Sequence, residues 1–312
     1  MRPALKPGLL TVWRDRDTLQ IGIDARRAVA LTGMADAAWI IGLLDGSRDR
    51  ADVVRAAADG GVPAQAAERV LTLLAAAGVV EDFPAATLRV LPPPVRTRLA
   101  PELATASLAH GDSDGGARTL ARRLAAQVTV HGQGRLGAAI ARILRTSGIG
   151  QVVLANAAGP ASASSASYPT RPDLMVLTGQ RPPEFQDALI RDQVPHLAVS
   201  ASEAIGVVGP LVIPGSSACL RCLDLIRAER DPAWPLILAQ LAGRQPDPLG
   251  CDAPLAAAVA AQAAFQALAL IDRPGLVHAV TNGTLELVLP GWQWRRRTWP
   301  PQPRCSCGAA AA

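Results

Sequence analysis

The stretch of sequence that decides the fold is residues 127–150, QVTVHGQGRLGAAIARILRTSGIG. It opens on the alternating segment QVTVH, which predicts a β-strand, and residues 135–146 have the apolar spacing of an amphipathic helix. Gly132, Gly134 and Gly137 lie where the strand passes into the helix, in a G-x-G-x-x-G arrangement. Such glycines let backbone N–H groups approach a phosphate, but close packing of a helix on a strand requires them too. The motif therefore favours a Rossmann-type fold more strongly than nucleotide binding.

The segments that follow continue the alternation of strand and helix. Because strands separated by helices of this size form parallel sheets, we expect an α/β domain with a mostly parallel sheet. The second strand ends in Asn156, where dinucleotide-binding proteins place a carboxylate, and this weakens the expectation of a nucleotide site. The expected elements are strands at 151–156, 173–177 and 196–200, a helix at 184–192, and an antiparallel edge from 205–214, 277–282 and 285–289.

The first 82 residues predict a separate small α+β domain of winged-helix type. Short alternating runs at 18–23 and 28–31, with a further one at 9–13, indicate strands, and three helical patterns follow. Residues 83–115 contain three consecutive prolines and a glycine-rich segment, a composition typical of a linker. We therefore expect a module at 1–82, a linker at 83–115 and the Rossmann-like body at 116–312.

Composition narrows the classes of function. A chain of 312 residues that is 49% hydrophobic suggests two folded domains and argues against disorder. The net charge of +5 rests almost wholly on arginine, since Lys6 is the single lysine, and a coding bias explains this better than nucleic-acid binding. Any lysine-dependent chemistry must use Lys6 or be absent.

The apolar segments of the sequence indicate where the protein is located in the cell. The N-terminus lacks the apolar core of a signal peptide, and the apolar segment 254–271 is alanine-rich and carries Gln262 and Gln266, which favours a buried helix. We expect a cytoplasmic protein with neither a membrane nor a nucleic acid as partner. The arginine run 295–297 between Trp294 and Trp299 fits a solvated strand edge better than a nucleic-acid surface.

The cysteines indicate a metal site. Cys219 and Cys222 form one close pair and Cys305 and Cys307 another, and four thiolates in two chelating pairs suit structural zinc. Plain free thiols are the alternative. Such a metal would stabilise the C-terminal tail and leave no open position for catalysis. Cys251 stands alone before a helix, where buried packing is favoured over a nucleophilic role.

In combination these motifs resemble the ThiF/MoeB family, the relatives of ubiquitin-activating enzymes. The resemblance covers about residues 116–307 and rests on the glycine-loop helix and on the segment ACLRCL at 218–223. The surroundings, GPLVIPGSSACLRCLDLIRAERDPAWPLILAQL at 209–241 and WQWRRRTWPPQPRCSC at 292–307, are similar to actinobacterial ThiF-like proteins that bind leader peptides as cyclodehydratase components. In that subgroup a PqqD-like winged-helix module precedes the body, as residues 1–82 would here.

Active members of the wider family adenylate a carboxylate with ATP and magnesium. The resemblance implies an aspartate at the end of the second strand, an arginine and a lysine after it, and a later aspartate. This sequence has Asn156 at the first position, neither basic residue in 157–169, and Gln180 near the last position. Nucleotidyl transfer needs cations on the triphosphate and a carboxylate for magnesium, so the residues argue against ATP and magnesium as ligands.

We therefore expect a non-catalytic scaffold. The N-terminal sheet would accept an extended leader peptide as an added strand. The resemblance implies that the body presents the precursor to a separate YcaO-type ATP-dependent enzyme. It also implies a possible homodimer. An ATP-dependent adenylyltransferase is the alternative, and a nicotinamide-dependent oxidoreductase explains none of the cysteines. The peptide-binding candidates, which also fit an ordinary domain core, are Val29, Leu31, Val70 and Leu74.

Overall fold

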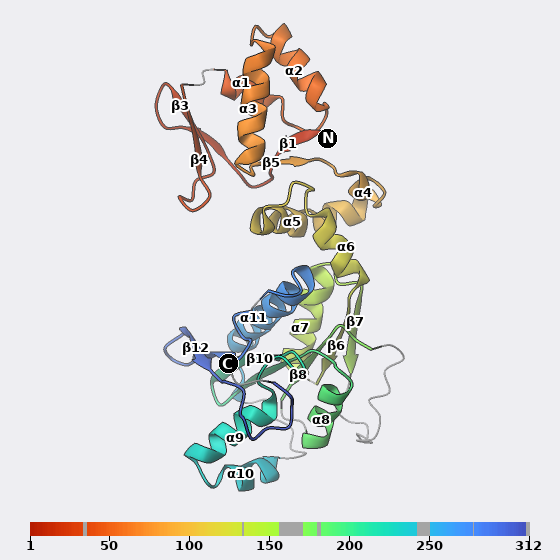
Figure 1. Ribbon diagram of the computed structural model, residues 1–312, viewed down its shortest axis with the longest axis vertical. Helices are drawn as coiled ribbons and strands as arrows, with labels where there is room; N and C mark the ends of the chain where they lie inside the picture. The colour runs from red at the N-terminus through yellow and green to blue at the C-terminus, as the bar shows by residue number, and fades with distance from the viewer. Residues whose placement is uncertain are drawn as a thin grey trace. The chain divides into compact units, whose positions relative to one another are not determined.

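The structure is a computed structural model, and it divides into two compact units, Met1–Ala121 and Arg122–Ala312. Both units combine helices with β-sheet (Figure 1), and each is described by itself. The described residues are 1–33, 36–132, 134–155, 171–179, 182–241, 250–276 and 278–309, apart from the side chains of residues 86 and 87.

The first unit contains two small antiparallel sheets. Strands β2, β3 and β4 form a three-stranded sheet in that order, and β1 pairs with β5. The division between the units falls within α6. The elements are β1 (Pro3–Leu5), β2 (Thr11–Trp13), β3 (Thr18–Ile21), β4 (Val29–Thr32), α1 (Ala37–Gly42), α2 (Arg50–Asp59), α3 (Ala64–Ala76), β5 (Val80–Asp82), α4 (Ala86–Arg89), α5 (Pro93–His110) and α6 (Ala117–Ala125).

The core of this unit forms where α3 packs with α1, α2 and the three-stranded sheet. Helix α3 buries Ala67, Val70 and Leu74, which lie on one face because they are three and four residues apart. Ile21 of β3 and Leu31 of β4, which share one face of the sheet, belong to the same buried cluster. Packing of an amphipathic helix on one sheet face thus holds the module together, and β4 remains at the edge of its sheet.

Residues 83–115 are largely helical, although their composition predicts a linker. Helix α5 starts directly after Pro92 and carries Pro93 and Pro94 in its first turn. Proline fits this position because its missing N–H would have no partner within the helix. Leu88 of α4 and Leu99 of α5 belong to a buried cluster of their own. The prolines therefore mark a helix start, and the segment is a folded part of the first unit.

The single lysine is buried in a polar network of the first unit. Lys6 is 1% exposed, and its Nζ donates a hydrogen bond of 2.9 Å to the carbonyl oxygen of Ser107. The Ser107 hydroxyl donates to the buried carboxyl group of Glu81. Burial lowers the pKa of Lys6 and raises the pKa of Glu81. The network joins the end of β1 to β5 and α5, which explains why α5 belongs to this unit.

The second unit is built on a seven-stranded mixed sheet. The strand order is β12-β11-β10-β9-β8-β6-β7, with parallel pairing from β9 to β7 and antiparallel pairing from β9 to β12. Residues 278–282, expected as a strand, form turns instead. The elements are β6 (Gln127–His131), α7 (Gly134–Thr146), β7 (Gln151–Ala155), β8 (Leu174–Thr178), α8 (Pro183–Arg191), β9 (His196–Ser202), β10 (Ile205–Val212), α9 (Leu220–Arg230), α10 (Trp234–Leu241), α11 (Ala253–Asp272), β11 (Gly283–Val288) and β12 (Trp294–Thr298).

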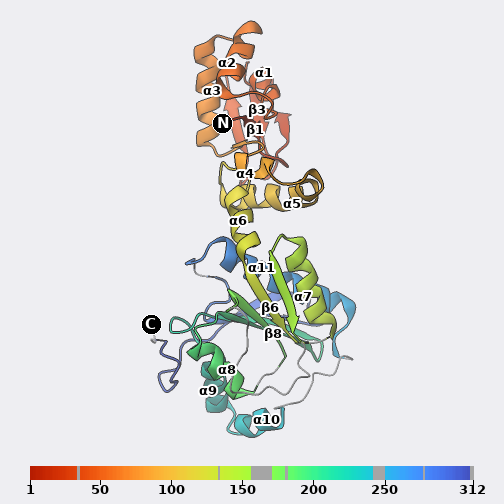
Figure 2. The same ribbon diagram turned by 90° about the vertical axis from the view of Figure 1, so that its right-hand side faces the viewer.

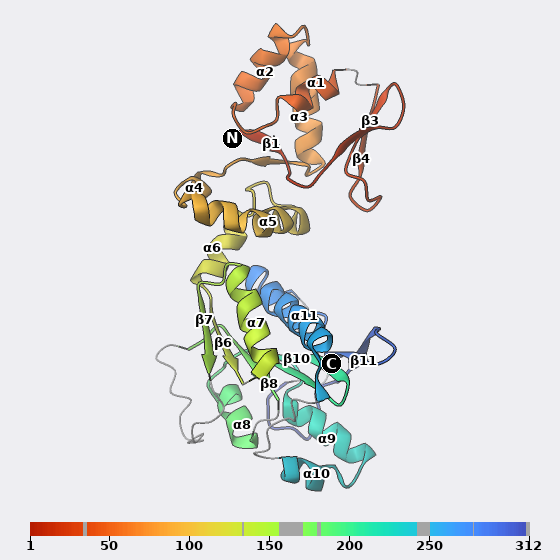
Figure 3. The ribbon, with the colours of Figure 1, turned by 180° about the vertical axis from the view of Figure 1, so that it is seen from behind.

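Helices cover both faces of this sheet. Leu174 and Val176 of β8 belong to the large cluster that includes α7 and α11, whereas Met175 and Leu177 pack with α8 on the opposite face. A strand buried on both faces explains the continuous apolar run of β8. Figures 1 and 3 show α7 and α11 side by side, and Figure 2 shows α8 and α9 beyond the sheet. The protein is therefore a mixed α/β protein with one large sheet and two smaller antiparallel ones among its described residues.

Helix α11 is the long apolar helix that the sequence predicts to be buried. Among the described residues it alone is long and apolar enough to cross a membrane, a criterion that the core helix of a soluble protein also meets. Its most apolar window is 56% buried. Leu255 and Val259 contribute to the core with α7 and the sheet, so packing against the sheet accounts for the apolar composition.

Candidate functional site

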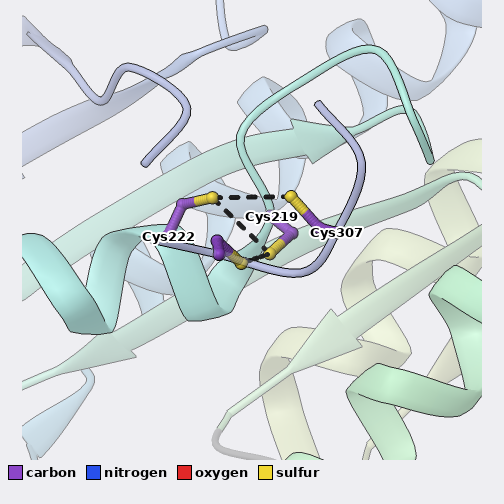
Figure 4. Close-up of side chains that lie close together, drawn as sticks. Cys219, Cys222 and Cys307 are labelled. Atoms are coloured by element: carbon purple, nitrogen blue, oxygen red, sulfur yellow. Dashed lines mark hydrogen bonds between the residues drawn. The ribbon is translucent and has the colours of Figure 1, made fainter. Parts of the chain in front are cut away.

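The four paired cysteines converge in the second unit. Cys219 is the N-cap of α9 and Cys222 lies in its first turn, so both side chains face the same side of the helix. The C-terminal tail brings Cys305 and Cys307 to them, and all four sulfur atoms lie within 4.8 Å of one another. Figure 4 shows the sulfur atoms of Cys219, Cys222 and Cys307 turned toward one another. The sequence prediction of one cluster from two distant pairs agrees with this arrangement.

The distances in the cluster fit a tetrahedral metal ion. The sulfur atoms of Cys219 and Cys222 are 3.8 Å apart, and those of Cys219–Cys305 and Cys222–Cys307 are each 3.6 Å apart. Four zinc–sulfur bonds of about 2.3 Å in tetrahedral geometry place the sulfur atoms about 3.8 Å from one another. A disulfide would need about 2.05 Å, and all four cysteines are free. The donor set therefore fits structural zinc.

The electrostatics of the cluster call for a cation. Burial raises the pKa of the Cys219 thiol, and it raises the pKa of Cys305 to about 11. Burial also opposes ionisation of Cys307, but the N–H of Ala309 and the neighbouring thiols bring its pKa below the usual value. If Cys307 is ionised, three more thiolates beside it would repel one another unless a positive ion were bound. A metal ion binds thiolates and displaces their protons.

Trp299 connects the tail to the body next to the cysteines. It is 1% exposed, packs in one cluster with Cys219 and Cys222, and donates its indole N–H to the hydroxyl of Thr284 at 2.9 Å. The N–H of Gln302 donates to the sulfur of Cys222 at 3.4 Å. The Trp299 indole, the Gln302 N–H and the cysteine thiols together hold residues 299–307 against the second unit.

The glycine loop is shaped largely by packing. A Cβ on Gly132 would lie 1.7 Å from Oγ1 of Thr178, and one on Gly137 would lie 3.1 Å from the carbonyl oxygen of Gly132. Glycine at 132 therefore lets the end of β6 approach Thr178 at the end of β8, and glycine at 137 gives α7 a close contact with the backbone of Gly132. Gly134 differs, because it has a φ of +83° and open space where a Cβ would be. Asn156, the fourth candidate of the nucleotide site, lies outside the described residues.

A small cavity lies at the carboxyl ends of parallel strands, where α/β proteins bind ligands. It has a volume of about 110 Å³, and Gly179, Ser200, Asp224 and Arg227 contribute to its lining. Burial raises the pKa of Asp224, whose carboxylate accepts hydrogen bonds from the Trp234 indole at 3.1 Å and from Arg227 at 3.5 Å. Sequence reasoning missed these residues, although the D-x-x-R spacing on a helix was a usable signal.

The four peptide-binding candidates of the first unit lie in or beside its core. Leu31, Val70 and Leu74 are buried members of the core, and Val29 is half-buried against it. Leu31 and Val29 of β4 thus pack in the same core as Val70 and Leu74 of α3. The module exposes the backbone edge of β4, which pairs with β3 and with no other described strand. On α3, the side chain of Leu73 is exposed. An open strand edge of this kind is a common acceptor for an extended peptide.

Comparison with known proteins gives a likeness in fold. No family model and no curated sequence matches the chain. E. coli MccB crystallised with AMPCPP and MccA has a TM-score of 0.70 at 13% identity, and the match covers 99% of this chain and 100% of that chain. A heterocyclase in complex with substrate and cofactor has a TM-score of 0.71 at 20% identity, covering 99% of this chain and 39% of that one. The heterocyclase TruD has a TM-score of 0.69 at 19% identity, covering 99% and 43%.

Proposed function

We propose that the chain is a ThiF/MoeB-like scaffold that binds the leader of a precursor peptide and presents the precursor to a separate YcaO-type ATP-dependent enzyme, which forms azolines. The observation that supports this most is the likeness over 99% of the chain to heterocyclases such as TruD, whose own chains are more than twice as long as the matched part. In this proposal the remaining activity comes from a partner chain. The second unit is then a Rossmann-like ThiF-type body.

The leader would bind to the first unit, which we take to be a winged-helix, PqqD-like module. An extended segment added to the edge of β4 gains main-chain hydrogen bonds, and side chains at alternate positions reach toward α3. Leu31, Val70 and Leu74 keep that edge and helix in place from within the core, while Val29 and Leu73 are accessible to the ligand. Affinity would come mainly from the backbone and specificity from the apolar contacts.

The remaining site residues support a structural role for the second unit. Gly132 is required by packing, and Gly137 lies close against the carbonyl oxygen of Gly132. Lys6, the single lysine, is buried in the first unit, whereas the glycine loop belongs to the second. Bound to Cys219, Cys222, Cys305 and Cys307, zinc would stabilise the tail without an open position for substrate. We propose that this body positions the precursor and does not adenylate it.

One observation favours an alternative, an ATP-dependent adenylyltransferase. The MccB structure with AMPCPP shares the fold over the whole of that chain. Gly134 also leaves open space at the start of α7, where a helix N-terminus favours an anion. A nucleotide-binding measurement with magnesium separates the two functions: the scaffold shows neither micromolar ATP affinity nor ATP–pyrophosphate exchange.

The scaffold function is tested by panning a displayed library of random peptides on the full chain. Hydrogen exchange then locates the bound peptide, and we expect slower exchange in β4, at Val29–Thr32, when the peptide is bound. The matched control is a scrambled peptide of the same composition. Recovered peptides that leave exchange in β4 unchanged, or a library that yields no binder, would contradict the proposal.

A further inference from the structure

A hollow of about 740 Å³ lies on the β11–β12 hairpin of the second unit. Arg295, Arg296 and Arg297 of β12 contribute to its lining, as does Gln293 just before the strand. Arg295 and Arg297 share one face of β12, because side chains two residues apart on a strand point to the same face. Glu286 and Val288 line it from β11. The volume lies within the range of ordinary ligand pockets, about 300–1,000 Å³.

The arginines of this hairpin differ in what they already bind. Arg296 donates to the carbonyl oxygens of Ala279 and Thr281. Arg297 lies 3.8 Å from the carboxylate of Glu286 and stacks over Trp299. The guanidinium group of Arg295 is exposed and forms no hydrogen bond or ion pair within the described part of the chain. The hollow therefore contains one guanidinium group that is available to an anion.

The backbone of β12 is available as well. It is the last strand of the seven-stranded sheet and pairs with β11 on one side; no described strand pairs with its other side. Four of its five residues are exposed. An edge of this kind presents alternating N–H and C=O groups that another extended chain can pair with.

We propose that the β11–β12 hairpin binds an extended acidic peptide segment, which pairs with the open edge of β12 while one of its carboxylates bonds Arg295. The positive charge of Arg295 favours an acidic peptide over a second copy of the same strand. A second copy of the same strand would place arginine against arginine, which disfavours self-pairing, whereas aspartate or glutamate matches a guanidinium in two parallel hydrogen bonds. A nucleic acid would use the charge but would leave the backbone edge unpaired.

This site lies in the second unit and does not depend on the proposed peptide edge of β4. The test uses the full chain and a fluorescent, capped heptapeptide of alternating threonine and glutamate, with binding measured by anisotropy. We expect Arg295→Glu to weaken binding about tenfold, the size of one lost charge-assisted contact. Arg142→Glu is the matched control, because Arg142 is an exposed arginine on α7. It should leave the affinity unchanged.

Three further probes sharpen the outcome. A threonine–glutamine heptapeptide should bind weakly, since it lacks carboxylates, and N-methylation along one edge of the acidic peptide should abolish binding while methylation along the other edge should not. Equal binding of the glutamine peptide, an equal loss in Arg142→Glu, or no binding of the acidic peptide would overturn the proposal. So would tighter binding of an eight-nucleotide oligothymidine with the same dependence on Arg295, which would identify a nucleic-acid site. Panning for ligands of β4 is read out separately, in the first unit.

Discussion

Arg123 of α6 and Asp272 of α11 lie 149 residues apart in the sequence and form a buried ion pair, in which Nε and Nη2 of the arginine are 2.8 and 2.7 Å from the two carboxylate oxygens. The arginine also donates to the carbonyl oxygen of Ser147 at the end of α7. Their side chains are 9% and 4% exposed. Within the second unit, Arg123 thus links the last turn of α6 to the end of α11 and to the residue that follows α7.

Removing one partner of this pair should destabilise the second unit strongly. We expect Arg123→Ala to lower the free energy of unfolding by about 3–5 kcal/mol, because Asp272 remains buried without its counter-charge. Arg191→Ala is the control, since its pair with Asp192 is exposed, and it should change the free energy by less than about 1 kcal/mol. Urea unfolding of both variants measures the difference. Equal effects would show that the buried pair is not a major source of stability.

Zinc should be bound at one ion per chain and should stabilise the second unit. We expect Cys222→Ser to lose stoichiometric zinc and to lower Tm by about 5 °C or more, because four ligands are needed to close the site. Cys251→Ser should retain zinc, since Cys251 is not part of the cluster. Elemental analysis and thermal unfolding with and without a chelator measure both effects. A chelator-insensitive Tm in the unaltered protein would contradict a structural metal.

Stability should fall as the pH is lowered from neutral, in part because of His196. Burial lowers the pKa of this histidine from 6.5 to about 4. The unfolded chain therefore binds a proton below about pH 6.5 that the folded chain does not accept until about pH 4, and the stability lost in this window is on the order of 3 kcal/mol. Urea unfolding at several pH values measures the slope. His196→Gln should have a shallower slope; an unchanged slope would assign the effect to other groups.

Two glycines of one loop should respond differently to alanine. Gly132→Ala places a Cβ against Thr178 at a φ of +148°, and we expect a loss of about 3 kcal/mol or more from overlap and backbone strain. Gly134→Ala meets only the backbone strain of φ +83°, about 1–2 kcal/mol. Chemical denaturation compares the two. Similar losses would mean that packing does not explain why Gly132 is a glycine.

The local patterns of the sequence predicted the centre of the second unit well. The strand at 127–131, the glycine turn and the helix to Thr146 are all present, because each is determined by neighbouring residues: alternating apolar positions, glycine at positive φ and helical spacing. The cysteine cluster was also predictable, since two chelating pairs in one chain leave few other arrangements. These features need no knowledge of distant contacts.

Features that depend on distant contacts could not be predicted. The prolines at 92–94 read as a linker because composition does not show whether a segment packs, and α5 packs with α4 and α6 in a cluster of its own. The pairing of Lys6 with Ser107 joins residues 101 positions apart. The sequence leaves Leu31 and Val70 open between ligand contact and ordinary core, with core favoured, and only the fold shows that both side chains are buried. Local sequence specifies an element, whereas its neighbours determine what the element exposes.

Because Lys6 is buried, the rate at which it is chemically labelled reports how often the first unit opens locally. Because the single lysine side chain is 1% exposed and held to Ser107, acylating reagents have no accessible lysine while the first unit is closed. The rate of lysine acylation therefore counts the openings of the junction between β1, β5 and α5, in a background free of other lysines. Because no lysine is accessible, amine-directed cross-linkers will fail to capture partners through lysine. Carboxylate- or arginine-directed reagents are therefore the ones suited to this protein.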